Sequence, residues 1–212
     1  MAPTSRSAAM ASTRTASVVA TLGVAGACWA VAAQQMRGMD MGTHSTLGSF
    51  PFFVGAWTSM MAATMLPGAL PAVLRFVRGK GRVLAAPVFA TLYLAVWILV
   101  GLAVYAVYRP HGAWIAGTLT VAAGLYELTP LKRSCRHRCR ESVRSGLQFG
   151  LHCVGSSAGL MLVLAAVGVM SLTWMGLIAA IVAAQKLLAP RAVVDVPVAL
   201  GIVGLGVALL PL

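Results

Sequence analysis

The sequence predicts an all-α protein, a polytopic transmembrane helical bundle of about seven spans, with the N-terminus inside and the C-terminus outside. Three observations support this fold. Apolar residues make up 59% of the 212 residues, charged residues make up only 9%, and the mean hydropathy is +0.88. This leaves too little polar surface to coat a soluble particle. The apolar residues also form long stretches, and basic residues flank these stretches on one side.

Each apolar stretch can cross or nearly cross a hydrocarbon core roughly 30 Å thick, at about 1.5 Å of rise per residue. The predicted spans are Ala16–Ala33, Phe50–Leu74, Ala85–Tyr108, Ala113–Leu131, Leu147–Met170, Leu172–Leu188 and Val193–Leu212. No connecting segment is long enough to fold by itself. Residues 1–212 are therefore predicted to form a single integral membrane domain, with residues 1–15 as a short cytoplasmic tail.

Lysine and arginine residues set the predicted orientation, because they are enriched in cytoplasmic loops. All but two of the 16 basic residues lie on one side of the predicted spans, and the exceptions are Arg37 and Arg109. That side is predicted to face the cytoplasm of a bacterial cell, with the bundle in the inner membrane. The basic residues behind the net charge of +12 lie mostly in these loops, which favours attraction to anionic lipid over nucleic-acid binding.

The first and last spans allow other interpretations. Arg6 and Arg14 precede an apolar run ending in Ala-Val-Ala-Ala, a pattern that is also typical of a cleaved signal peptide. Cleavage would leave six spans, but the length of the run favours a retained helix. Asp195 and Pro197 stand at the start of the last span, where a tilted or partly interfacial helix would also fit.

The outer segment after the first span is rich in soft metal ligands. Met36, Met39, Met41 and His44 all occur within Gln34–Ser49. Thioether sulfur and imidazole suit Cu(I) better than Mg²⁺ or Ca²⁺, which prefer oxygen ligands. The segment is therefore a candidate copper site. Methionines that simply touch lipid or neighbouring helices would give the same pattern.

The second span continues this chemistry. Trp57, Met61 and Met65 are spaced i, i+4, i+8 and form one stripe along a helix, with Met60 at its edge. The helix starts on the side where the methionine-rich segment lies, so the stripe is a candidate path for a soft ion. Core packing is the alternative. Two prolines follow, and such irregularities are tolerated in membranes where the helix is buried or lines a cavity.

The fifth span carries a polar stripe. Gln148, His152 and Ser156 share a face, with Cys153 beside them. Such groups are costly in a bilayer, so they are expected to face other helices, either as packing contacts or as metal ligands. Glu127, near the inner end of the fourth span, is expected at the same depth. Its predicted partner is His152.

The inner segment Lys132–Gly146 is predicted to be a loop that contains Cys135, His137 and Cys139. Two thiols and an imidazole so close in sequence can bind zinc or Cu(I), and neighbouring arginines lower thiol pKa values. The same arginines oppose a bound cation, and no fourth ligand is evident, so a basic loop with incidental cysteines fits equally well. The thiols are expected to be reduced on the cytoplasmic face.

Several blocks of this sequence resemble a bacterial family described as predicted metal-binding integral membrane proteins. They are Trp57–Pro67, Ala123–Lys132, Cys135 with Cys139, and Leu172–Met175 with Lys186. The resemblance covers about residues 50–190 and implies a link to metal, with copper handling in some members. The chain departs from the family at two places. Ser156 and Ser157 stand where the family commonly has further cysteines, and Glu127 stands where it usually has glutamine.

We therefore predict an integral membrane protein that binds or passes a soft metal ion, with Cu(I) as the expected ion. The predicted ligands are Met36, Met39, Met41, His44, Met60, Met61, Met65, His152, Cys153, Cys135 and Cys139. The expected partners are the lipid bilayer, the metal ion and a membrane or periplasmic protein, not nucleic acid. An enzyme is not expected, because known hydrolytic and nucleotide-binding motifs are missing and the chain has four acidic residues.

Two alternatives stay open. One is a metal-free membrane scaffold or assembly subunit that docks a partner through its basic cytoplasmic loops. The other is a thiol redox relay through the cysteines. Neutralising the inner arginines would weaken partner binding in the first case, and thiols that resist alkylation and oxidation would exclude the second.

Overall fold

The computed structural model describes residues 5–35, 47–80, 84–109, 112–141, 144–168, 171–188 and 192–210. Within these ranges the chain forms helices and no strands, which confirms the all-α class. The helices are α1 (Ser5–Gln35), α2 (Phe50–Lys80), α3 (Ala85–Val107), α4 (Ala113–Glu127), α5 (Pro130–Glu141), α6 (Gly146–Val167), α7 (Leu172–Leu187) and α8 (Ala192–Leu209).

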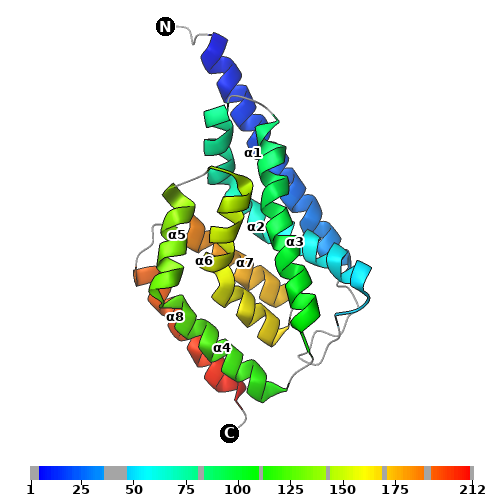
Figure 1. The fold of residues 1–212 in the computed structure, drawn as a ribbon, viewed down its shortest axis with the longest axis vertical. Helices are drawn as coiled ribbons and strands as arrows, with labels where there is room; N and C mark the ends of the chain where they lie inside the picture. Colours follow the sequence, from blue (N-terminus) through cyan, green and yellow to red (C-terminus); the bar gives the residue numbers. More distant parts are fainter. Residues whose placement is uncertain are drawn as a thin grey trace.

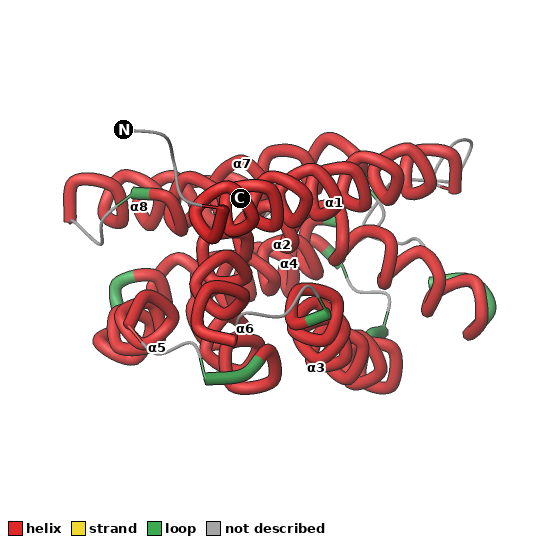
Figure 2. Tube along the Cα trace, turned by 90° about the horizontal axis from the view of Figure 1, so that it is seen from above, coloured by secondary structure: helices red, strands yellow, loops and turns green. Residues whose placement is uncertain are grey.

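The helices run up and down an elongated bundle (Figure 1). Seen from above, α1, α7 and α8 lie along one side and α3, α5 and α6 along the other (Figure 2). The central helix is α2, which packs against α1, α3 and α7. Trp57 and the three methionines of its stripe are almost fully buried. The side chain of Trp57 also donates a hydrogen bond of 2.7 Å to the backbone oxygen of Trp97.

Four described helices are long and apolar enough to cross a membrane: Thr15–Gln35 within α1, Phe50–Gly79 within α2, α3 and α6. The helices Leu172–Leu187 and Asp195–Leu209 are apolar but shorter. With 15 residues, α4 would reach only about 22 Å at the usual rise of an α-helix. The number of spans and the orientation of the termini therefore stay predictions.

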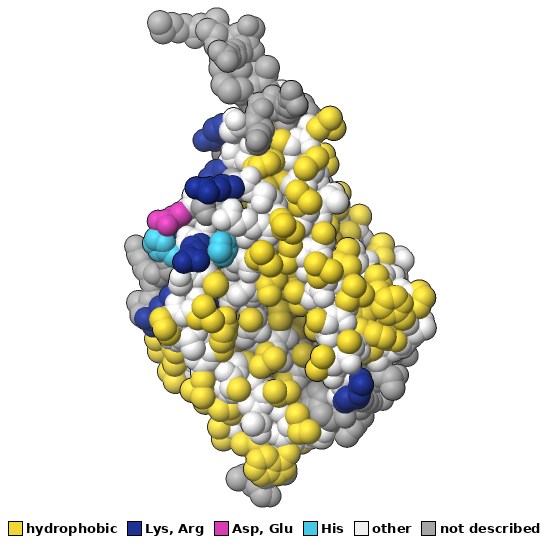
Figure 3. All heavy atoms as spheres, in the orientation of Figure 1, with side chains coloured by type: hydrophobic (Ala, Val, Ile, Leu, Met, Phe, Trp, Pro, Cys, Tyr) yellow, Lys and Arg dark blue, Asp and Glu magenta, His cyan; other side chains and the backbone are white. Residues whose placement is uncertain are grey.

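Basic side chains gather at one end of the molecule. In Figure 3 they form a group at the upper left, while hydrophobic side chains cover much of the remaining face. The same end holds the last turns of α2, the start of α3, the helix α5 and the start of α6 (Figure 1). Because successive helices alternate in direction, basic segments that are far apart in sequence lie at the same end of the molecule.

The predicted loop at Lys132–Gly146 is wrong over most of its length, because Pro130–Glu141 forms α5. Proline suits the first position of a helix, where its missing N–H costs nothing. The hydroxyl of Thr129 accepts a weak hydrogen bond of 3.4 Å from the backbone N–H of Lys132, which helps to cap the first turn. Lys132 and Arg136 are buried on one face of this helix.

Small residues allow close approach between α4 and α8. A Cβ atom added at Gly124 would lie 2.6 Å from the side chain of Val203, and one added at Gly206 would lie 2.7 Å from the backbone nitrogen of Val121. Neither position can accept a larger residue without moving the partner helix. The pair α4–α8 therefore depends on backbone proximity.

Candidate functional site

Three sulfur-bearing side chains from three helices gather near Lys186 of α7. Met65 of α2 is fully buried, and its Sδ atom lies 3.7 Å from the Lys186 Nζ atom. The Sγ atom of Cys153 in α6 lies 3.1 Å from the hydroxyl of Tyr93, which in turn lies 3.4 Å from Lys186 Nζ. Cys139 of α5 is close enough to Cys153 and Lys186 for both to change its pKa. We call Met65, Cys139 and Cys153 the sulfur cluster.

The thiol of Cys139 is held in its neutral form. Burial raises its pKa to about 12, and the neighbouring Cys153 contributes in the same direction. The ammonium group of Lys186 and a hydrogen bond with Ser156 oppose this shift but are outweighed. All four cysteines of the chain, including Cys28, are free thiols.

Lys186 brings a positive charge into the space beside the sulfur cluster. Its aliphatic stem crosses α2 at Gly68, where an added Cβ would lie 2.6 Å from the Lys186 Cδ atom. Its ammonium group also lies 5.9 Å from the centre of the Tyr93 ring, within reach of a cation–π interaction. The chain therefore places a cation of its own beside the Met65 thioether and the Tyr93 hydroxyl.

The two thiols and the imidazole of α5 do not form one site. His137 is exposed and pairs with Glu141 at 3.0 Å on the outer face of the helix. Cys135 instead packs on Gly155 of α6, where an added Cβ would lie 2.7 Å from its sulfur. Residues two apart on a helix point in nearly opposite directions, so the helical form of this segment separates the imidazole from both thiols.

The other predicted ligands are distributed differently. Met60 and Met61 are buried in the core, about a turn from Met65 along α2. His152 is half-buried on α6. Met36, Met39, Met41 and His44 lie outside the described residues. Within the described ranges, no three His, Cys, Asp or Glu side chains come together as a metal site, so a site at the sulfur cluster needs the methionine thioether.

The predicted pair of Glu127 and His152 is wrong. Glu127 pairs with Lys132, and its Oε2 atom also accepts a hydrogen bond of 3.0 Å from the Gln185 amide. Lys132 also donates to the Gln185 carbonyl at 3.0 Å. The break between α4 and α5 turns Lys132 back toward Glu127. Neither a continuous helix nor an irregular loop over these residues would lead one to expect this pair.

Burial lowers the pKa of Lys132, while the carboxylate of Glu127 acts in the opposite direction. Both side chains are almost completely removed from solvent, at 1% and 0% exposure. Gln185 supplies a donor to the acid and an acceptor to the base. This buried triad holds α4, α5 and α7 together at the basic end of the bundle.

Tyr93, Gln185 and Lys186 were not predicted as site residues. Tyrosine within an apolar run is common, and lysine at the end of an apolar helix is typical of a helix that reaches the membrane surface. The one weak sequence signal for these site residues is the adjacent amide and charged pair Gln185-Lys186 near the end of α7. Their role becomes evident only when α2, α3 and α6 are placed around them.

The chain matches the model of a family described as "PpoB2: Copper chaperone" over residues 54–209. The chain belongs to this family. The match includes every helix from α3 to α8 and nearly all of α2. It also reaches further toward the C-terminus than the predicted region of about residues 50–190.

Membership of the copper chaperone family supports copper handling in general and agrees with the predicted link to a soft metal. The sulfur cluster lies within the matched region, whereas α1 and the methionine-rich segment after it lie before the match begins. No curated protein and no solved structure matches the chain.

Proposed function

We propose that this member of the copper chaperone family is an integral membrane protein that binds Cu(I) at the sulfur cluster. The observation that carries the proposal is that one thioether from α2 and two thiols from α5 and α6 lie around Lys186 and Tyr93, with Cys139 near enough to Cys153 for that thiol to raise its pKa. Met65 and Cys153 have no exposed surface. Soft sulfur ligands select Cu(I) over harder ions.

The charges around the cluster favour this binding mode. Cu(I) would displace the protons of Cys139 and Cys153, and a copper ion held by two thiolates carries one net negative charge. The ammonium group of Lys186, which lies 3.7 Å from the Met65 sulfur, supplies the compensating positive charge. A buried charge is tolerated when it is paired in this way.

The supply of copper to this site forms the second part of the proposal. Met60 and Met61 are buried on α2 between the cluster and the start of that helix. They would pass the ion inward from Met36, Met39, Met41 and His44, the soft ligands between α1 and α2. This path requires the predicted orientation, seven spans in the bacterial inner membrane, and a delivery role without enzymatic activity.

Anaerobic competition between the detergent-purified protein and a Cu(I) chelator would test the site. We expect a single tightly held copper ion, with sulfur neighbours visible by X-ray absorption. Cys139→Ser and Cys153→Ser should each weaken binding by about 10-fold or more, which corresponds to about 1.4 kcal/mol. Met65→Leu should weaken binding less, because a neutral thioether is the weaker of the two ligand types.

Matched control variants distinguish copper binding at the sulfur cluster from copper binding by sulfur side chains elsewhere in the chain. Cys28→Ser removes a thiol from α1, and Met175→Leu removes a buried thioether on α7 about 16 Å along the helix from Lys186. Both control variants should bind copper as the parent does. Parent-like affinity in Cys139→Ser and Cys153→Ser would refute the site. Loss of all copper after replacing only Met36, Met39 and Met41 with leucine would place the ligands in the outer segment.

A further inference from the structure

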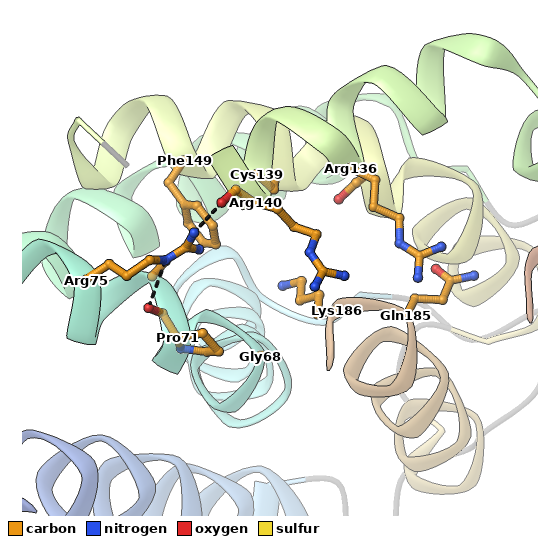
Figure 4. Close-up of a pocket in the computed structure, with 11 residues that line it drawn as sticks. Gly68, Pro71, Arg75, Arg136, Cys139, Arg140, Phe149, Gln185 and Lys186 are labelled. Atoms are coloured by element: carbon orange, nitrogen blue, oxygen red, sulfur yellow. Dashed lines mark hydrogen bonds between the residues drawn. The ribbon is translucent and has the colours of Figure 1, made fainter. Parts of the chain in front are cut away.

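Four basic side chains surround a small cavity, which Cys139 of the sulfur cluster also lines. Arg75 comes from α2, Arg136 and Arg140 come from α5, and Lys186 comes from α7 (Figure 4). The cavity has a volume of about 40 Å³, and Gln185 also lines it. In Figure 4 the side chains of Arg136 and Arg140 extend from α5 toward Lys186 and Gln185.

Backbone carbonyl groups hold two of these arginines at the mouth of the cavity. Arg75 donates to the carbonyl of Pro71 at 3.2 Å and also to the carbonyl of Arg140. Arg140 donates to the carbonyl of Leu188 at 2.9 Å. Both arginine side chains remain exposed. These bonds orient the guanidinium groups without neutralising their charge.

Arg136 forms the inner wall and is incompletely satisfied. It is 4% exposed, pairs with Asp195 and donates to the carbonyl of Leu188 at 3.3 Å. Its Nε atom is buried and has no hydrogen-bond partner. Asp195 therefore satisfies this guanidinium group only in part, and the residue still lines the cavity with a charged side chain.

The acidic residues that the structure describes leave most of the positive charge around this cavity unpaired. It contains four acidic residues, Asp40, Glu127, Glu141 and Asp195. Glu127 is bonded to Lys132, and Glu141 pairs with His137 on the exposed face of α5. Asp40 belongs to the segment between α1 and α2, outside the described residues. Among the described carboxylates, Asp195 is thus the one that pairs with any of the four cations, and its partner is Arg136.

We propose that this cavity binds a phosphate group, either as a free phosphate ion or as part of an anionic phospholipid headgroup. The planar fork of arginine matches phosphate oxygens in a two-point contact, and several such contacts at once give strong, charge-assisted hydrogen bonds. The volume is about three times the roughly 10–15 Å³ that one water molecule needs, so the cavity can hold more than a single water molecule. The proposal does not depend on copper binding.

The position of the cavity suits both sources of phosphate. It lies at the basic end of the bundle, near the ends of α2, α5 and α7 where the exposed arginines gather. A headgroup would reach it from the membrane surface and a free ion from the surrounding water. The exposed Arg75 and Arg140 form the entrance in either case.

Thermal unfolding of the copper-free protein in a neutral detergent would test the site. One arm adds inorganic phosphate, and the other adds short-chain phosphatidylglycerol, each at constant ionic strength. We expect a saturable rise in the unfolding temperature in at least one arm. The double variant Arg75→Gln, Arg140→Gln should weaken binding of that ligand by about 10-fold or more, because it removes two charge-assisted contacts.

The matched control is the double variant Arg78→Gln, Arg138→Gln. It removes two exposed arginines that lie on the same two helices but do not line the cavity. This control should keep parent affinity. Stabilisation by phosphate alone identifies a free-ion site, and stabilisation by lipid alone identifies a headgroup site. No saturable stabilisation in either arm, or equal loss in both double variants, overturns the proposal.

Discussion

Replacing Glu127 with glutamine should destabilise the protein strongly, even though the two side chains have nearly the same shape. In the parent, Glu127 and Lys132 are paired at 0% and 1% exposure, with Gln185 bonded to both. The variant leaves the Lys132 ammonium buried among neutral groups. Removing one partner of a buried ion pair costs about 3–5 kcal/mol. For a chain of this size, that predicts a fall of about 6–20 °C in the unfolding temperature.

The loss of stability in the Glu127→Gln variant should also depend on pH. Burial already lowers the pKa of Lys132, and removing the carboxylate that opposes this shift lowers it further. Between the lowered folded pKa and the ordinary value of 10.5, the unfolded chain binds more protons than the folded variant. Stability of the variant therefore rises with pH across this window. The deficit relative to the parent should be larger at neutral pH than near pH 10.

Tryptophan fluorescence during heating of the detergent-purified protein would measure both effects. The double variant Glu127→Gln, Lys132→Met removes both charges and should recover most of the lost stability, since a buried pair is often replaceable by neutral groups at little cost. An unfolding temperature of Glu127→Gln within about 2 °C of the parent at every pH would refute the reasoning, because it would mean that the pair is solvated.

Three further outcomes follow from the packing. Iodoacetamide should label Cys139 in the folded copper-free protein at pH 8 about 1,000-fold more slowly than in urea, because its pKa is about 12; peptide mass spectrometry that finds rates within 10-fold would contradict this. Gly101→Ala should cost about 1–3 kcal/mol, because an added Cβ would lie 2.4 Å from the Trp57 ring, whereas Gly201→Ala, which meets nothing within 4 Å, should be neutral or stabilising in the same heating assay. Ser145→Ala should cost about 1 kcal/mol, because the Ser145 side chain accepts the Gln148 N–H at the start of α6; a stability equal to that of a Ser145→Asn control would contradict the capping role.

The apolar helices could be predicted from sequence because each follows from a local property. The predicted second and third spans begin at Phe50 and Ala85, where α2 and α3 begin. Length and hydrophobicity are sufficient to locate such helices. They are not sufficient to locate α5, whose basic composition is typical of a loop. One of its two buried residues, Arg136, pairs with Asp195, which lies 59 residues later in the sequence.

The candidate site was predicted in part for the same reason. Met65, Cys139 and Cys153 stand out by residue type alone, because sulfur is a soft ligand in any fold. Helical periodicity places each on a face of its own helix but does not show which faces meet. Tyr93 and Lys186 therefore could not be assigned to the site, and His137 could not be excluded from it, before the arrangement of α2, α3, α5, α6 and α7 was known.

The pairing of α8 with α4 has a consequence for biosynthesis. The ribosome makes α8 after α4 and α5. Gly124 of α4 and Arg136 of α5 nevertheless contact residues of α8, Val203 and Asp195. A nascent chain that ends before residue 192 would carry an uncovered glycine groove and an uncompensated buried arginine. The packing of α4 and the pairing of Arg136 are therefore completed only after α8 has been synthesised.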